Sequence, residues 1–515
     1  MRPDTPVAPS PAIHPTEPIT VPASSPDVDG SLLRGVAWTG GVKWATQLIG
    51  WGSTIVVARL LSPGDYGIVG MATLYLGLLS LVSEFGVGTA IVTIRSLTEE
   101  QIAQINSISV LLGIAGYVVS LAVSPLLGRF FHEPRLPLVL AVMSLTFVIS
   151  SFRTVPWALL QRDLRFKRIA MLDGLQALAL SIATVILALL GFRYWTLVGA
   201  SVLSAIMSAA IALVIHRHRF AVPRPRELRD ALGLGREVII QRVAWYAYSN
   251  ADFLVAGRML GKDALGAYNL GWTLANLPIE KVGNMVLQVT PSILGTVQHD
   301  QPALRRYVLR ISEALALVTL PVTFGLALVA PDLVPLALGP KWSSMILSLQ
   351  ILSFYSAVRA MLPLFSQVLI ATGESRFGSK NMLAAAVVMP IAFLIGSHWG
   401  LTGIALAWLI VHPAIAAFLC ARTFRTIALS PRLFFADAIW PALSSGLVMA
   451  AAVLALGAAL PASAGHAVRL AAQCGTGALV YPAAFLVLHK ARVRAVVQGL
   501  AILRGKAAAP GAAAA

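Results

Sequence analysis

The chain contains one short stretch twice, first as Val56-Val57-Ala58-Arg59-Leu60-Leu61 and again as Val255-Ala256-Gly257-Arg258-Met259-Leu260. The copies keep one constant offset, because Gly67 follows the first copy at the same spacing as Gly266 follows the second. Each copy lies at the end of an apolar run. A long internal repeat of this kind is typical of transporters that are built from two similar halves.

Composition places the repeat in a membrane. Of the 515 residues, 57% are hydrophobic and 12% are charged, and the mean hydropathy is +0.79. A soluble globular protein carries about twice that charged fraction. Apolar runs of about 20 residues recur along the chain, and each is long enough to span a bilayer as a helix. We therefore predict an all-α polytopic membrane protein with about 14 transmembrane helices, arranged as two parallel six-helix repeats plus two C-terminal helices.

The same runs predict where the domains begin and end. The first segment is polar and Pro-rich and has no signal-peptide pattern, so we expect a disordered cytoplasmic tail. The predicted parts are a tail (1–33), an N-terminal six-helix bundle (34–216), a basic linker (217–232), a C-terminal six-helix bundle (233–421), two additional helices (422–490) and a basic, Ala-rich cytoplasmic tail (491–515).

Basic residues predict the orientation. Lys and Arg gather in alternate loops, and the richer set includes the linker cations Arg217, Arg219, Arg224, Arg226 and Arg229. The positive-inside rule places this set, and with it both termini, in the cytoplasm. The net charge of +17 therefore indicates membrane orientation and not a nucleic-acid partner. We expect a multi-pass protein of the cell inner membrane.

Cations inside the apolar runs are the first candidate site residues. The constant offset places Lys43 opposite Arg242, and the fourth span of each half holds Arg153 or Arg359 shortly before a proline. Intramembrane charges are costly and usually face protein or a wet cavity. Four cations from two halves are suited to bind one anion, and arginine is suited to phosphate. For Lys43 and Arg242 the alternative is snorkelling to the headgroups.

Further candidates rest on less. Lys281 follows Glu280, and we expect it either to join the cavity or to neutralise its neighbour. For Trp245 and Tyr246 the alternatives are stacking on sugar rings and packing in the core. Asp252 and Glu84 are candidate carboxylates for ion coupling.

Two features have plainer interpretations. Trp272 lies near a predicted span end, where an interfacial aromatic belt explains it. His132 and Glu133 lie in an external loop, where we expect them to be solvated.

Several functional classes lack their motifs. The sequence has no P-loop, no dinucleotide fingerprint and no His/Cys cluster with metal-ligand spacing. We therefore expect no enzyme activity, no cofactor and no bound metal.

Several short motifs occur in the order found in one transporter family. They are Ala58-Arg59-Leu60-Leu61-Ser62-Pro63-Gly64-Asp65-Tyr66-Gly67, Phe85-Gly86-Val87-Gly88-Thr89-Ala90, Leu160-Gln161-Arg162-Asp163-Leu164-Arg165-Phe166-Lys167-Arg168, Asn250-Ala251-Asp252, Leu265-Gly266-Ala267-Tyr268, Leu338-Gly339-Pro340-Lys341-Trp342 and Gly400-Leu401-Thr402-Gly403-Ile404-Ala405. This pattern resembles the Wzx-type polysaccharide repeat-unit flippases of the multidrug/oligosaccharidyl-lipid/polysaccharide exporter superfamily. The resemblance covers residues 32–430.

The resemblance implies a function. Such proteins move undecaprenyl-pyrophosphate-linked oligosaccharide from the cytoplasmic to the periplasmic leaflet for capsule, exopolysaccharide or O-antigen assembly. The implied mechanism is alternating access, and the implied partners are membrane lipids, a polymerase and export machinery. A basic cavity between two bundles fits a pyrophosphate, which cannot cross hydrocarbon alone.

Other functions remain as alternatives. A cation-coupled exporter of small drugs from the same superfamily requires an acidic cavity, whereas the intramembrane charges here are mainly basic. A lipid II flippase would use the same physics with other loop motifs. A non-transporting scaffold of a polysaccharide synthase has no use for intramembrane charge, and a membrane glycosyltransferase or polymerase needs carboxylates in an external loop.

Overall fold

A computed structural model describes residues 46–84, 87–94, 96–163, 165–215, 219–224, 236–298, 300–461, 463–490 and 492. Throughout these ranges the secondary structure is helical, with turns and no strand. Lys43, the predicted 1–33 tail and almost all of the predicted 491–515 tail lie outside the described residues.

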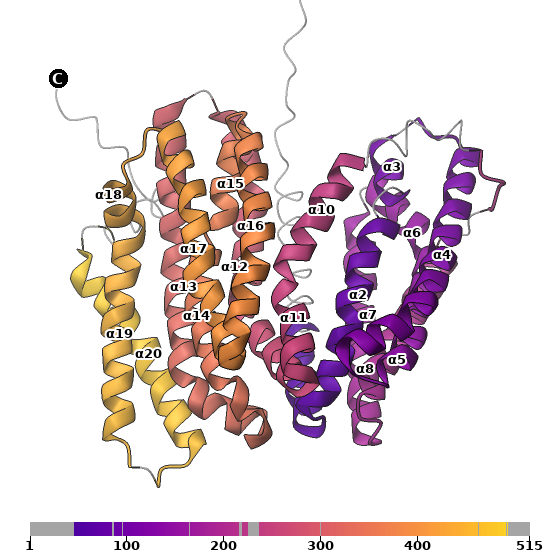
Figure 1. The fold of residues 1–515 in the computed structure, drawn as a ribbon. Coiled ribbons are helices and arrows are strands. Elements are labelled where there is room, and N and C mark those ends of the chain that lie inside the picture. Colours follow the sequence, from indigo (N-terminus) through magenta and orange to yellow (C-terminus); the bar gives the residue numbers. More distant parts are fainter. Residues whose placement is uncertain are drawn as a thin grey trace, which may run out of the picture.

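The first half forms one bundle (Figure 1). It begins with a helix over residues 46–60. The helices that follow are α2 (Pro63–Glu84), α3 (Val87–Thr93), α4 (Glu99–Phe131), α5 (Leu136–Met143), α6 (Leu145–Arg162), α7 (Phe166–Leu189) and α8 (Trp195–Ile215). Local sequence sets the limits of α4, because Thr98 and Gln101 form a capping box at its start and His132 adopts a left-handed conformation at its end.

The second half forms another bundle beside the first. Its elements are α10 (Arg236–Ser249), α11 (Ala251–Val255), η1 (Ala256–Leu260), α12 (Gly261–Thr296), α13 (Gln301–Ala337), η2 (Pro340–Met345), α14 (Ile346–Arg359), α15 (Leu362–Ala371), α16 (Ser375–Gly396), η3 (Ser397–Trp399) and α17 (Gly400–Thr426). The last elements are α18 (Pro431–Phe434), η4 (Phe435–Ile439), α19 (Trp440–Ala459) and α20 (His466–Leu488).

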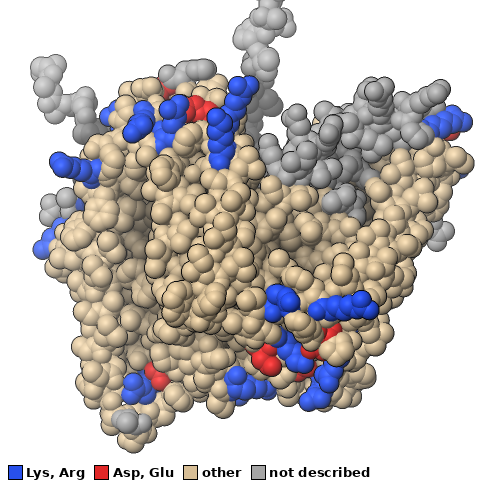
Figure 2. All heavy atoms as spheres, viewed as in Figure 1, with Lys and Arg blue, Asp and Glu red and all other residues tan. Residues whose placement is uncertain are grey.

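Length and hydropathy confirm a multi-pass membrane protein. Ten stretches of the described chain are long and apolar enough to cross a bilayer, and one of them, Ser375–Thr426, contains both α16 and α17. Large apolar side chains face outward, such as Ile182, Val387 and Leu479. On the face shown in Figure 2, Lys and Arg lie toward the two ends of the molecule, with a largely uncharged band between them. The count of fourteen helices and the domain limits stay predictions.

The halves meet most closely where α2 crosses α12. A Cβ atom on Gly67 would overlap the backbone carbonyl of Lys262, and one on Gly266 would overlap the carbonyl of Pro63. These two glycines are the repeat-related pair, so the internal repeat brings its own two copies into backbone contact. Only glycine permits such an approach. We call this the crossing end of the molecule, and the end that carries Glu99 and residues 219–224 the linker end.

Other bonds between the halves surround the crossing. Trp342 Nε1 donates to the backbone oxygen of Ala58 at 2.9 Å, and Lys341 Nζ donates to that of Arg59 at 2.7 Å. Arg59 Nε in turn donates to the Ala337 oxygen at 2.8 Å. Because Trp342 is fully buried, its indole nitrogen requires such an acceptor.

The expectation of solvation holds for His132, which is exposed, and is wrong for Glu133. Glu133 is 5% exposed, and Lys262 Nζ lies 2.7 Å from its Oε2. Arg258 contacts the imidazole of His132. Sequence spacing gave no sign of these partners, because they belong to the other half of the chain.

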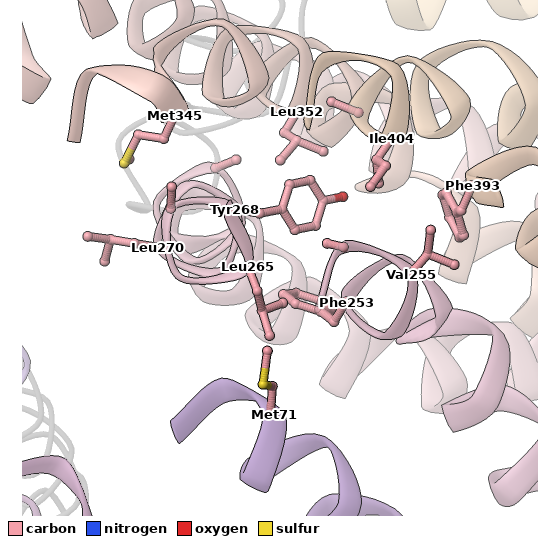
Figure 3. Packing of buried hydrophobic residues seen from close by; sticks show 14 of the residues in the cluster. Met71, Phe253, Val255, Leu265, Tyr268, Leu270, Met345, Leu352, Phe393 and Ile404 are labelled. Atoms are coloured by element: carbon pink, nitrogen blue, oxygen red, sulfur yellow. The ribbon is translucent and has the colours of Figure 1, made fainter. Parts of the chain in front are cut away.

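One hydrophobic core extends across the crossing. It joins Met71 of α2 with Leu265 and Tyr268 of α12 and with Phe253 of α11. Figure 3 shows Met71 pointing from α2 toward Leu265 and Phe253. The core therefore stabilises the contact between the halves as well as each half.

The last helix, α20, is joined to α13 by polar contacts near both of its ends. Near the crossing end, Asp332 lies 2.8 Å from His466 Nδ1 and 3.4 Å from Arg469 Nε. Near the linker end, Arg492 lies 2.8 Å from both Glu313 and Asp437. This helix therefore belongs to the second bundle.

The glycine crossing predicts a large effect of adding one methyl group. We expect Gly67→Ala to destabilise the folded protein by about 1–3 kcal/mol, because the new Cβ has no room against the Lys262 carbonyl. The control is Gly325→Ala in α13, where nothing lies within 4 Å of the new atom and helix propensity favours alanine. Thermal unfolding in detergent measures both. Equal melting temperatures for the two variants would contradict the tight crossing.

Candidate functional site

The first helical segment described in the second half is interrupted. α10 ends at Ser249, α11 begins after Asn250, and the next turn, η1, is a π-helix that ends before Gly261 with φ 85°. π-Helical turns and interrupted spans often mark functional sites, because they leave backbone and side-chain groups for other uses. The interruption places Asp252 in the interior of the second bundle.

Asp252 is a fully buried carboxyl held by two neutral donors. Its Oδ2 accepts hydrogen bonds from Tyr268 Oη at 2.9 Å and from Trp408 Nε1 at 2.8 Å. In the part of the chain that the structure describes, no side chain donates to Oδ1 and no cation pairs with the carboxyl. A buried carboxylate without a cation is costly, so this position suits a group that takes up a proton or an ion.

Aromatic rings continue from Asp252 through the bundle. Trp408 packs against Trp272 with ring centroids 5.3 Å apart and stacks on Tyr355 at 5.1 Å. Tyr355 Oη lies 3.2 Å from His412 Nδ1. The prediction that Trp272 belongs to an interfacial belt is wrong, because its ring lies inside this stack.

Arg359 lies at the other side of the stack. Its guanidinium donates to the Asn276 side-chain oxygen and sits over the Trp272 ring at 5.1 Å from the centroid. It also acts electrostatically on Tyr355 and His412. Asn276 and Trp272 are one helical turn apart on α12, so one face of that helix positions the guanidinium. We call the connected set the Asp252–Arg359 network: Asp252, Tyr268, Trp408, Trp272, Tyr355, His412, Asn276 and Arg359.

Arg153 has a separate set of partners in the first bundle. Its Nη1 donates to Gln176 Oε1 at 3.0 Å, and its Nη2 lies 3.7 Å from Asp173. The guanidinium also covers the Trp157 ring at 4.0 Å from the centroid. Gln176 donates onward to Ser204 at 3.2 Å, which fixes the amide orientation. Arg153 is one-quarter exposed, so part of it remains accessible.

The other predicted residues are placed as follows. Arg242 and Trp245 are exposed on α10. Tyr246 donates to the backbone oxygen of Leu74 in α2 at 3.0 Å, so its hydroxyl joins the two halves. Glu84 and Lys281 lie in helices, but their side chains, like the whole of Lys43, are outside the described structure. Convergence of the four cations stays a prediction.

Several members of the network were not predicted from sequence. Tyr268, Trp408, His412 and Asn276 are polar or aromatic residues within apolar spans, which is the signal that a search for ionisable residues alone overlooks. Throughout the described ranges, no group of three His, Cys, Asp or Glu side chains is arranged to hold a metal ion.

The chain was compared with known protein families. A family model described as "Polysaccharide biosynthesis protein" matches residues 56–347, which is more than half of the chain. The chain belongs to this polysaccharide biosynthesis protein family.

Two curated proteins are similar in sequence over most of their length. The lipopolysaccharide biosynthesis protein WzxC of Escherichia coli (strain K12) is 25% identical over 386 residues, covering 72% of this chain and 78% of the relative. The succinoglycan biosynthesis transport protein ExoT of Rhizobium meliloti (strain 1021) is 23% identical over 496 residues, covering 94% of this chain and 98% of the relative.

A solved structure supports the fold. The lipid II flippase MurJ in an inward closed conformation superposes with a TM-score of 0.74 and 13% sequence identity, covering 89% of this chain and all of MurJ. At that identity the match shows a shared fold, so the all-helical architecture of this family member is confirmed.

Two substitutions at Asp252 separate its charge from its hydrogen bonds. We expect Asp252→Asn to leave stability almost unchanged, because the amide oxygen still accepts from Tyr268 and Trp408. Asp252→Leu should destabilise the fold, because each buried donor left without an acceptor costs about 1–3 kcal/mol. Thermal unfolding in detergent compares them. If Asp252→Asn lowered the stability as much as Asp252→Leu, the hydrogen bonds from Tyr268 and Trp408 would not be what stabilises residue 252.

Proposed function

We propose that this polysaccharide biosynthesis family member is a flippase for lipid-linked oligosaccharide. It moves undecaprenyl-pyrophosphate-linked repeat units from the cytoplasmic to the periplasmic leaflet by alternating access, for exopolysaccharide, capsule or O-antigen biosynthesis. Its place is the cell inner membrane, where a polymerase and export machinery take up the product.

The seal around the α2–α12 crossing carries the proposal. Two similar bundles touch backbone to backbone at one end, and hydrogen bonds and an ion pair surround that contact. The bundles diverge toward the linker end (Figure 1). Such an arrangement supports access from one side at a time. The family membership, the transport function in the name of ExoT and the fold shared with a lipid flippase support the same cargo class.

Loop charge supports the orientation. The linker end carries the Arg-rich loops, including Arg219 and Arg224, which the positive-inside rule places in the cytoplasm. With that orientation the crossing end faces the periplasm, and both termini lie in the cytoplasm. The described state then receives cargo from the cytoplasmic leaflet.

Arg153 and Arg359 supply the groups for the pyrophosphate. Each guanidinium is held by one amide side chain, Gln176 or Asn276, and by one tryptophan ring. A guanidinium has five N–H donors, so at Arg359 the contact with one amide oxygen leaves donors for phosphate oxygens, whereas at Arg153 a phosphate would replace the Asp173 carboxylate. The aromatic contacts keep each cation in place when no phosphate is bound. We include Lys43, Arg242 and Lys281 in the same cavity, with Trp245 and Tyr246 beside them.

Asp252 is the candidate for ion coupling, with Glu84 as the second. Its carboxyl is connected through Trp408, Tyr355 and Trp272 to Arg359. Binding of a proton or cation at Asp252 would alter the packing of that stack. The stack would then change the position of Arg359, which links ion binding to release of the anion.

Removal of the cations tests the cavity. We expect Arg153→Gln, Arg359→Gln and Arg242→Gln together to abolish polymer export, with complete lipid-linked repeat units accumulating on the cytoplasmic leaflet. The control replaces Arg168, Arg376 and Lys380 with Gln, because these cations are exposed near the linker end. Thin-layer analysis of extracted lipids and their access to an impermeant glycosidase measure both. Normal export in the first variant would exclude the cavity mechanism, and loss of repeat units before the flip would favour a scaffold role.

A disulfide across the crossing tests alternating access. A Cβ on Gly64 would lie 2.6 Å from Asp263 Oδ1, so Gly64→Cys and Asp263→Cys place two thiols within bonding reach. Cys420 and Cys474 are first replaced by Ser to leave a single pair. We expect oxidation to stop transport and a reductant to restore it. Transport that continues in fully cross-linked protein would show that the crossing does not have to open.

A further inference from the structure

The first bundle contains a pocket that the proposed mechanism has not used. It has a volume of about 280 Å³ and lies between α2, α4, α6 and α8. The volume is close to the lower limit of about 300–1,000 Å³ for small-molecule sites. Hydroxyl side chains from all four helices line it, among them Thr73, Ser80, Ser109, Ser150, Thr154 and Ser201.

Among the residues that the structure describes, none that lines the pocket is charged. Its remaining members are small or apolar, including Phe147, Met143 and Leu76. A pocket lined by hydroxyls and by no ionised side chain suits a neutral polar ligand. A charged ligand would lose its hydration there without gaining a counter-ion. The apolar members offer a surface for C–H groups.

The hydroxyls are oriented by the protein backbone. Ser201 donates to the Val198 oxygen at 2.8 Å, Ser80 to the Gly77 oxygen at 2.8 Å, and Ser109 crosses from α4 to the Ser151 oxygen of α6 at 3.2 Å. A hydroxyl has one donor and two acceptor lone pairs. Since these three hydroxyls donate within the protein, they present acceptor oxygens to the pocket, which complement a ligand that carries several hydroxyl donors.

Space for the ligand depends on glycine. Gly113 of α4 forms part of the wall, and a Cβ there would lie 2.7 Å from the Phe147 oxygen and 3.0 Å from Ser151 Cβ. The close approach of α4 to α6 therefore fixes one side of the pocket. The opposite side is the α2 helix, which crosses the second half.

We propose that this pocket binds a sugar ring of the cargo, at a position beyond the sugar bonded to the pyrophosphate. The inference rests on the proposed function and adds a recognition site for the glycan. A neutral ring with hydroxyls on its edge and C–H groups on its faces matches the acceptors and the Phe147 wall.

The position of Arg153 agrees with this assignment. Ser150 and Thr154 line the pocket from α6, and Arg153 lies on the same turn but points to Gln176 and Asp173 of α7. The Arg153 guanidinium therefore lies beside the pocket and not in its lining. Because a pyrophosphate held by Arg153 would lie outside the pocket, we assign the pocket to a sugar beyond the proximal one.

The test uses purified full-length protein in proteoliposomes and two lipid probes. The first probe is the lipid-linked repeat unit extracted from cells that lack this protein, and the second is the same lipid trimmed to its proximal sugar. Access of an added pyrophosphatase, which cannot cross the bilayer, measures flipping of both probes in the same way. The variant Thr73→Val with Ser150→Ala removes two hydroxyls without adding bulk, and Ser150→Phe fills the pocket.

We expect the hydroxyl-deletion variant to flip the full repeat unit roughly tenfold more slowly, as loss of two hydrogen bonds implies, and the trimmed lipid at nearly the wild-type rate. Ser150→Phe should show the same selectivity more strongly. Leu145→Phe, an exposed position on the same helix, is the control for bulk.

Equal slowing of both probes, or no slowing of either, would overturn the sugar site while leaving the flippase proposal intact. If wild-type protein moved neither probe, the flippase proposal itself would fail, and the sugar site with it.

Discussion

Contact between the backbones of α2 and α12 is the constraint on which the arrangement of the two halves depends. Gly67 and Gly266 are equivalent positions of the repeat, and each leaves room for the partner's carbonyl. Hydrogen bonds and an ion pair between the halves surround this contact, including Trp342 to Ala58 and Lys262 to Glu133. The contact combines close packing, which is strong in any solvent, with polar bonds that water can replace. A seal of this composition can be both tight and reversible.

The interior of the second half shows how the protein holds polar groups in a membrane. Asp252 has hydrogen-bonding neighbours of no formal charge, whereas Arg359 has an amide and an aromatic face. Neither group is neutralised by the other. The two sites thus keep the capacity to bind a partner from outside, which a direct ion pair between them would remove. Arg153, paired with Asp173, is the more self-sufficient of the cations.

The sequence contained enough information for the fold but only part of the site. Apolar runs and the repeat of Gly67 at Gly266 predicted two similar helical halves, because periodicity and composition act locally along the chain. The partners of Asp252 could not be predicted in this way. Tyr268 follows it by little more than four turns, but Trp408 comes from a distant helix whose register depends on packing. Glu133 illustrates the same limit, since an external loop residue became buried only through the opposite half. Intramembrane charge drew attention to Asp252, Arg153 and Arg359, but it gave no sign of the neutral residues that contact them, such as Trp408 and Gln176.

The ion pairs of the C-terminal helices have a consequence for how such a chain can change in length. Asp332 and Glu313 belong to α13, but partners of both come from beyond residue 460, where His466 and Arg469 contact Asp332 and Arg492 contacts Glu313. A chain truncated after α17 would leave Asp332 without Arg469 and would leave Glu313 with Arg310 of its own helix. Gain or loss of the terminal helix pair therefore changes the surroundings of carboxyl groups on a helix more than a hundred residues earlier. An apparently modular extension is in this sense encoded in two places.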